Sequence, residues 1–238
     1  MFWLMEGMCF LPTFLVIWSS CSFIVSYIIS LFEHHVPPVF PYISDTGTHT
    51  PESGIFSIMI VISAFLGVAT MYTRYKFVEK LNEATHTVNP RLNHITFYVG
   101  LIGCMGMCVV ASFQETVITS VHDIGALIAF LFGVIYILLQ SIVSYMSVPH
   151  GSSLPLCRVR MVISIISVVA VFPMIICAIY VNHSDPHWES YKEEDPYRMA
   201  SAVCEWIVAF GFIFYFLTYI KEFQTFTLIW KPEILLFP

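Results

Sequence analysis

Six separate stretches of this 238-residue chain are long and apolar enough to cross a lipid bilayer. An α-helix needs about 20 consecutive apolar residues to cross the hydrocarbon core, and an isolated strand would leave its backbone groups without partners in lipid. The sequence therefore predicts an all-α fold, a polytopic membrane protein built as a six-transmembrane-helix bundle. The predicted spans cover residues 10–32, 54–73, 94–112, 123–144, 161–181 and 201–220.

The composition restricts the classes of function. Apolar residues make up 58% of the chain and charged residues 11%, against about 45–50% and about 25% in soluble proteins. Basic residues are few and scattered in a chain of net charge −6, which excludes a nucleic-acid partner. The seven cysteines lie mostly inside the apolar stretches, so neither a disulfide framework nor a zinc site is indicated. Since no catalytic motif is present, we predict no enzyme, cofactor or bound metal.

Lysine and arginine concentrate on one side of the predicted bundle. With six spans, the N-terminus, the second and fourth loops and the tail share one face, and eight of the ten basic residues fall there. Cytosolic loops carry such an excess, so both termini are predicted to be cytosolic. We expect one membrane domain over residues 1–224 and a short cytosolic tail over 225–238. Asn182 begins a candidate glycosylation sequon on the lumenal face, although it abuts a span.

One face of the fourth predicted span carries small and polar side chains. They recur every three or four residues, which places them on one side of a helix: His122, Gly125, Ala129, Gly133, Tyr136, Gln140 and Ser144. We interpret this face as a close-packed helix contact, with a polar lining for a ligand or ion as the alternative. The predicted helix-packing residues are Gly125, Ala129, Gly133, Gly100, Gly103 and Gly67.

Ionisable side chains lie close to the predicted lumenal ends of several spans. An ionised group at mid-membrane costs about 2.5–3.5 kcal/mol, so their position needs an explanation. If the helices bring them together, they form an acidic, histidine-containing cluster facing the lumen; the alternative is a set of separate interfacial groups that cap helix ends. The candidate lumenal polar cluster is Asp45, Gln114, Glu115, His122, Asp123 and Glu205.

Several motifs resemble those of the damage-regulated autophagy modulator family, including its founding, stress-induced member. They are PYISDTGTHTPESGIF (41–56), TMYTRYK (70–76), FQE (113–115), VHDIGA (121–126), RMVIS (160–164) and CEWIVAFGFIFYFLTYIKEFQ (204–224). The resemblance covers about residues 1–224. It extends to a wider six-span superfamily that includes Sfk-type regulators of phosphoinositide kinases and factors that remodel glycosylphosphatidylinositol anchors.

The resemblance implies a function in the lysosomal or late endosomal membrane. A family member of this kind promotes autophagy and takes part in stress-induced apoptosis. We expect a non-enzymatic, multi-pass regulator in the lipid bilayer that modulates other membrane proteins. The alternative is an accessory protein that binds or remodels a phosphoinositide or glycolipid. In that case the 41–56 segment would cover a lipid-headgroup pocket whose acids include Asp45 and Glu205; otherwise it is a connector.

Overall fold

The computed structural model describes residues 7–184 and 196–228, except the side chains of 182–184. These residues form helices and turns, and no strand occurs among them. The elements are α1 (Phe10–Phe32), η2 (Asp45–Gly47), α2 (Glu52–Thr85), α3 (Pro90–Ser112), α4 (Thr119–Met146), α5 (Leu154–Ser184), α6 (Pro196–Leu217) and α7 (Ile220–Phe223). Six helices are long and apolar enough to cross a membrane, which confirms the predicted fold class. The side chain of Asn182 lies outside the described residues.

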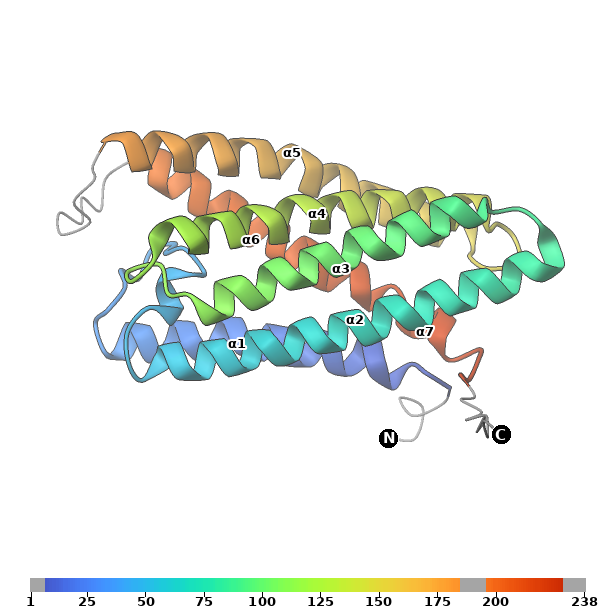
Figure 1. The fold of residues 1–238 in the computed structure, drawn as a ribbon, viewed down its shortest axis with the longest axis horizontal. Helices are drawn as coiled ribbons and strands as arrows, with labels where there is room; N and C mark the ends of the chain where they lie inside the picture. Colours follow the sequence, from blue (N-terminus) through green and yellow to red (C-terminus); the bar gives the residue numbers. More distant parts are fainter. Residues whose placement is uncertain (1–6, 185–195, 229–238) are drawn as a thin grey trace, which may run out of the picture.

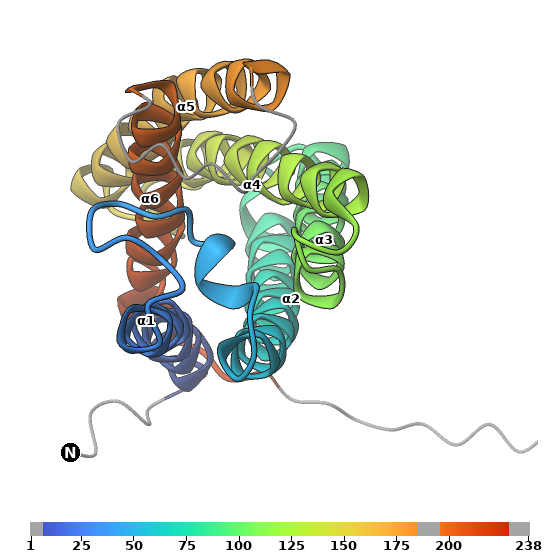
Figure 2. The same ribbon diagram turned by 90° about the vertical axis from the view of Figure 1, so that its left-hand side faces the viewer.

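The long helices lie side by side and alternate in direction (Figure 1). Each packs against the next along the chain, and α1 also packs against α6, which closes the bundle into a ring. Seen end-on, the 3₁₀ turn η2 occupies the middle of this ring (Figure 2). We call the end of the bundle that holds η2 the η2 end, and the opposite end, where α2 finishes and α3 begins, the α7 end.

The helix α2 continues well past residue 73, where the predicted span ends. Its polar extension carries ion pairs at helical spacing: Lys76 Nζ lies 2.7 Å from Glu79 Oε2, and Lys80 pairs with Glu83. Pairs three or four residues apart stabilise a helix modestly. The helix ends at Thr85, and the next residue, His86, adopts a left-handed conformation with φ of 52°. The apolar run thus marks the span and not the whole helix.

The small-residue face of α4 brings its backbone against α3. A Cβ atom on Gly106 of α3 would lie 2.5 Å from the Ala129 backbone nitrogen. One on Gly103 would lie 3.7 Å from the Ala129 carbonyl oxygen, and one on Gly125 of α4 would lie 2.7 Å from Val109 Cγ1. Helices approach this closely only where side chains are very small. The packing of α3 on α4 therefore depends on these glycines.

The other predicted packing glycines face side chains. A Cβ atom on Gly133 would lie 2.7 Å from the Phe212 ring of α6. Such atoms on Gly100 and Gly67 would lie 2.5 Å from Met71 Sδ and 3.4 Å from Cys104 Sγ. The first two positions are crowded, whereas a Cβ atom at Gly67 would be in ordinary van der Waals contact.

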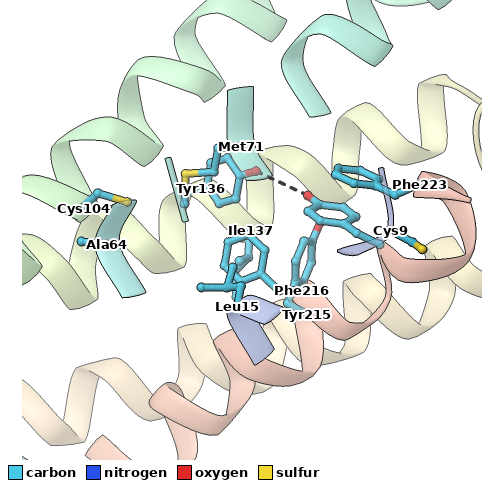
Figure 3. Close-up of a cluster of buried hydrophobic side chains, with 11 residues drawn as sticks. Cys9, Leu15, Ala64, Met71, Cys104, Tyr136, Ile137, Tyr215, Phe216 and Phe223 are labelled. Carbon is cyan, nitrogen blue, oxygen red and sulfur yellow. Dashed lines mark hydrogen bonds between the residues drawn. The ribbon is translucent and has the colours of Figure 1, made fainter. Parts of the chain in front are cut away.

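Aromatic side chains fill the bundle toward the α7 end (Figure 3). Tyr136 of α4 and Tyr215 of α6 are fully buried, as is Phe223 of α7. The hydroxyl groups of Tyr136 and Tyr219 lie 3.5 Å apart, and the Tyr219 ring stacks on Phe223 with centroids 5.5 Å apart. Buried phenols usually find a hydrogen-bond partner. These contacts seat the short helix α7 on the core of the bundle.

The beginning and the end of the described chain meet at the α7 end. The Met8 backbone N–H donates to the carbonyl oxygens of Phe223 at 2.8 Å and Phe226 at 3.1 Å. Gly7 has φ of 62°, and a Cβ atom there would lie 2.5 Å from the Phe223 oxygen. Glycine is required at this position for both reasons. The first and last described residues thus lie at the same end of the bundle, as expected for an even number of spans.

Candidate functional site

The segment between α1 and α2 folds inward and closes the η2 end of the bundle (Figure 2). Thr46 in η2 is buried, its hydroxyl donating to the Ile43 carbonyl oxygen at 2.7 Å and lying 3.0 Å from Ser26 Oγ of α1. A Cβ atom on Gly47 would lie 2.4 Å from the Phe56 ring of α2. Only glycine therefore fits at position 47, and η2 is seated between α1 and α2.

The first turns of α6 hold this segment from the other side. Glu205 is buried, and its Oε2 atom accepts a hydrogen bond of 2.9 Å from the Ile43 backbone N–H. The indole N–H of Trp206 donates to the Pro41 carbonyl oxygen at 2.9 Å. Buried backbone groups need hydrogen-bond partners. Two adjacent side chains of α6 supply such partners to the backbone of the segment.

An ion pair and a buried phenol complete the contact between the segment and α6. Arg198 Nη2 lies 2.6 Å from Asp45 Oδ2. The same guanidinium lies over the Tyr42 ring, 5.3 Å from its centroid. Burial raises the pKa of the Tyr42 phenol above its usual range, and the hydroxyl is hydrogen-bonded to Ser201. Tyr42 therefore stays protonated and acts as a packing and hydrogen-bonding group.

The connection between α3 and α4 adds a further carboxyl group. Glu115 is hydrogen-bonded to Ser44, and its Oε2 atom is buried without a hydrogen-bond partner. Burial raises the pKa of Glu115 well above its usual range, and the negative charges of Asp45, Asp123 and Glu205 add to the effect. Glu115 thus lies close enough to Asp45, Asp123 and Glu205 to interact with each of them.

His122 lies at the inner edge of the same region. It is 3% exposed, and its Nδ1 atom lies 2.7 Å from the Phe113 carbonyl oxygen. A carbonyl oxygen only accepts hydrogen bonds, so Nδ1 carries the hydrogen. In the neutral ring Nε2 is then an acceptor, and it is buried without a partner. Gln114 is half-buried and contributes its backbone carbonyl, which accepts from the Val117 N–H at 3.1 Å.

A cavity of about 150 Å³ lies inside the ring beneath the η2 end. Its polar wall includes the side chains of His122 and Glu205, together with Ser44 from the covering segment. The rest of the lining is mostly apolar and continues to Tyr136 and Phe216. The arrangement offers hydrogen-bonding groups at one end of a long apolar space.

A histidine–glutamate pair at the η2 end was missed by sequence reasoning. His35 Nδ1 lies 2.6 Å from Glu52 Oε1, and the rings of His35 and His49 have centroids 4.7 Å apart. Glu52 is fully buried, and its other carboxylate oxygen has no hydrogen-bond partner. An acidic residue at the start of a predicted helix, after a loop rich in histidine, was the available signal.

A buried charge cluster at the α7 end was missed as well. Arg74 of α2 and Arg160 of α5 are both fully buried and both contact Glu222 of α7. Arg74 Nη1 lies 2.8 Å from Glu222 Oε2, and Arg160 places two nitrogens 2.9 and 3.0 Å from the two carboxylate oxygens. Two cations thus share one anion among the described residues. We call these three side chains the arginine–glutamate cluster.

Polar side chains and an aromatic ring surround the arginine–glutamate cluster. Arg160 Nη1 donates to Ser144 Oγ of α4 at 2.9 Å. Both guanidiniums lie over the Tyr219 ring, 5.4 Å from its centroid for Arg74 and 4.6 Å for Arg160, within the range of a cation–π contact. Ser144 belongs to the small and polar face of the fourth predicted span, so that face was the available signal.

These features define a class of protein, a six-span α-helical membrane protein with a segment folded into one end and a buried ionic cluster near the other. A family model described as the Frag1/DRAM/Sfk1/Cwh43P N-terminal domain matches residues 7–226. The chain belongs to this family, and the resemblance noted from its motifs is confirmed.

Several curated relatives match almost the whole chain. The human protein named DNA damage-regulated autophagy modulator protein 1 is 53% identical over 97% of this chain and 97% of its own length. The mouse DNA damage-regulated autophagy modulator protein 2 is 39% identical, over 96% of this chain and 88% of its own. A zebrafish protein named modulator of macroautophagy TMEM150B is 30% identical over 90% and 84%. No solved structure matches.

Proposed function

We propose that this chain is a multi-pass regulator of the lysosomal membrane that promotes autophagy and takes part in stress-induced apoptosis. The observation that carries the proposal is the 53% identity, over nearly the full length of both chains, to a human protein named as a DNA damage-regulated autophagy modulator. The relatives are named as modulators and not as enzymes, which supports a non-enzymatic role for this chain.

The bundle supports action through other membrane proteins. Large apolar side chains such as Phe65, Val169 and Phe172 are exposed on the outer faces of α2 and α5. In a membrane such faces contact lipid or other transmembrane helices. The connections from α2 to α3, α3 to α4 and α4 to α5 are short, so we infer that partners are recognised mainly within the bilayer and at the two ends of the bundle.

We propose that the η2 end is the functional site and faces the lumen. Among described residues, the lysines and arginines at the α7 end are Arg74, Lys76, Lys80, Arg91, Arg158, Arg160 and Lys221. At the η2 end the described cation is Arg198. Because basic residues favour the cytosolic side, the α7 end is assigned to the cytosol.

A topology experiment tests this orientation. Epitope tags at either terminus should bind antibody after digitonin opens only the plasma membrane. A tag inserted after His34, in the segment before η2, should bind antibody only after the lysosomal membrane is also dissolved. Protection of the C-terminal tag in digitonin-treated cells would contradict the orientation.

A rescue experiment tests the function and the site together. In cells depleted of the chain, DNA damage should raise autophagic flux and apoptosis less than in parental cells. The wild-type chain should restore both and reach lysosomes. Glu205→Leu removes the acceptor of the Ile43 N–H and leaves a buried donor unpaired, which costs about 1–3 kcal/mol, so we expect it to restore flux at most partly.

The control is Leu217→Ala on the same helix. Its side chain is 46% exposed, and it lies away from the segment that contains η2. Its rescue should match that of the wild-type chain. Full rescue by Glu205→Leu would remove the η2 end as the functional site. Unchanged flux and apoptosis after depletion would remove the proposed function.

A further inference from the structure

A large apolar groove runs along the outside of the bundle. Helix α6 lies between α1 and α5 and packs against both (Figure 2), and side chains of all three helices line the groove, which has a volume of about 1030 Å³. On α6 the lining extends from Val203 to Phe214, which at 1.5 Å per residue corresponds to about 16 Å. The hydrocarbon core of a bilayer is about 30 Å thick, so the groove has the depth of one leaflet.

The segment between α1 and η2 closes the groove at the η2 end. Residues 38–41 line the groove there, and the Trp206 indole N–H holds the segment to α6 through the Pro41 carbonyl oxygen. In the end-on view the segment crosses α6 (Figure 2). A transmembrane helix of a partner continues out of the membrane, and residues 38–41 stand in its path. The groove therefore suits a molecule that lies within one leaflet.

Three aromatic side chains of α6 make the floor of the groove rigid. Trp206, Phe210 and Phe214 recur every four residues, and all three line the groove. The planes of neighbouring rings are inclined to each other by only 26° and 29°. Aromatic side chains have few rotatable bonds, so this floor is largely pre-formed. A rigid ring system loses little freedom on such a surface, whereas a flexible acyl chain must be ordered to lie along it.

The polar groups at the closed end of the groove are uncharged. Among the described residues that line the groove, none is acidic or basic. The Tyr27 hydroxyl donates to the Pro38 carbonyl oxygen at 3.0 Å in an exposed position, and its oxygen can still accept a hydrogen bond from a ligand hydroxyl. Arg198 is engaged by Asp45, so a phosphate headgroup would find no unengaged cation among the described residues of this end.

From this geometry we infer that the groove binds a sterol, that is, a rigid fused-ring lipid with a single hydroxyl group. The hydroxyl group bonds to Tyr27 beside residues 38–41, the rings lie against the aromatic floor, and the tail points toward the middle of the bilayer. The volume is sufficient, since pockets of about 300–1,000 Å³ hold compact ligands of drug size. The site extends beyond the proposed role in autophagy and does not depend on it.

Photolabelling of the purified full-length chain in phosphatidylcholine nanodiscs tests the site. The probes are cholesterol with a diazirine in the ring system, its epimer with the hydroxyl group inverted, and phosphatidylcholine with a diazirine in one acyl chain. Labelled residues are identified by mass spectrometry. We expect the cholesterol probe to label groove residues such as Ile207 and Phe210 about fivefold more than the epimer does, because the epimer loses one hydrogen bond.

Two neighbouring residues of α5 provide a matched pair of variants. Ile166 lines the groove and Ile165 lies outside it, although their side chains are similarly exposed, at 53% and 51%. Ile166→Trp should fill the groove and lower its labelling by the cholesterol probe to the level of lipid-facing residues elsewhere. Ile165→Trp should label like the wild-type chain. Both variants should keep the wild-type melting temperature, because both side chains face lipid.

A third variant tests the hydroxyl contact. Tyr27→Phe keeps the ring and removes the hydroxyl group, so labelling by the cholesterol probe should fall to that of the epimer, and labelling by the epimer should not change. An equal fall for both probes would mean that the segment has moved, and would contradict the contact between Tyr27 and the sterol.

Several outcomes would overturn the inference. Cholesterol labelling spread evenly over the lipid-facing residues would show that the groove holds only bulk lipid. Preferential labelling of the groove by the phosphatidylcholine probe would assign it to a phospholipid. A groove that neither lipid probe labels would be covered by a second copy of the chain. Wild-type labelling of Ile166→Trp, or equal labelling by cholesterol and its epimer, would contradict the proposed site directly.

Discussion

Replacement of Glu222 by glutamine should lower the free energy of unfolding by about 3–5 kcal/mol, the usual cost of breaking a buried ion pair by removing one partner. Arg74 and Arg160 are fully buried and share this carboxylate, so the variant leaves two buried cations without an anion. Denaturation of the purified chain in detergent, followed by circular dichroism, measures the effect.

An exposed ion pair and a double variant serve as controls. Glu83 pairs with Lys80 at the surface of α2, and Glu83→Gln should change stability by less than about 1 kcal/mol. Adding Arg74→Gln to Glu222→Gln removes one of the two stranded cations, so the double variant should be more stable than Glu222→Gln alone. Wild-type stability of Glu222→Gln would show that the arginine–glutamate cluster does not hold α7.

Substitution of Gly106 by leucine should also be severely destabilising. A Cβ atom at this position would lie 2.5 Å from the backbone nitrogen of Ala129, and backbone in a packed helix cannot turn aside as a side chain can. Overpacking costs about 1–3 kcal/mol and occasionally more; we expect the upper end here, because α3 and α4 must separate. The melting temperature in detergent reports the loss.

The matched control for helix propensity and added bulk is Gly54→Leu in α2, where the new side chain meets open space. It should melt at or slightly above the wild-type temperature because glycine is a poor helix former. If Gly106→Leu melted like Gly54→Leu, the close approach of α3 and α4 would be wrong.

The all-α class and six helices of spanning length were predictable because each span carries its own signal in a local run of apolar residues. The arginine–glutamate cluster was not, because Arg74 and Glu222 are 148 positions apart and no local pattern pairs them. In the sequence, Arg74 and Arg160 count as loop charges that indicate the orientation of the bundle. That interpretation does not reveal that both side chains are buried. The polar end of α2 was missed for a different reason, because the predicted spans followed the apolar runs alone.

The polar residues at the η2 end illustrate an intermediate case. Proximity to predicted span ends grouped Asp45, Glu115 and Glu205 as candidates, and the structure places their charges within reach of one another. Their individual partners could not be predicted, since Glu205 accepts from a backbone N–H 162 positions away. Nor could His35 be matched with Glu52, because the fold of the intervening loop decides that contact.

The meeting of Met8 with Phe223 and Phe226 has a consequence for biosynthesis. A membrane protein is made from its N-terminus, so α1 enters the bilayer long before α6 and α7 exist to complete its contacts. Until Glu222 has been synthesised, Arg74 and Arg160 lack the carboxylate that they share in the finished bundle, and water or another protein must solvate the two guanidiniums. The contacts that complete the ring therefore form only when residues 222–226 have been synthesised. Exposure of Arg74 and Arg160 would mark a bundle that is still incomplete.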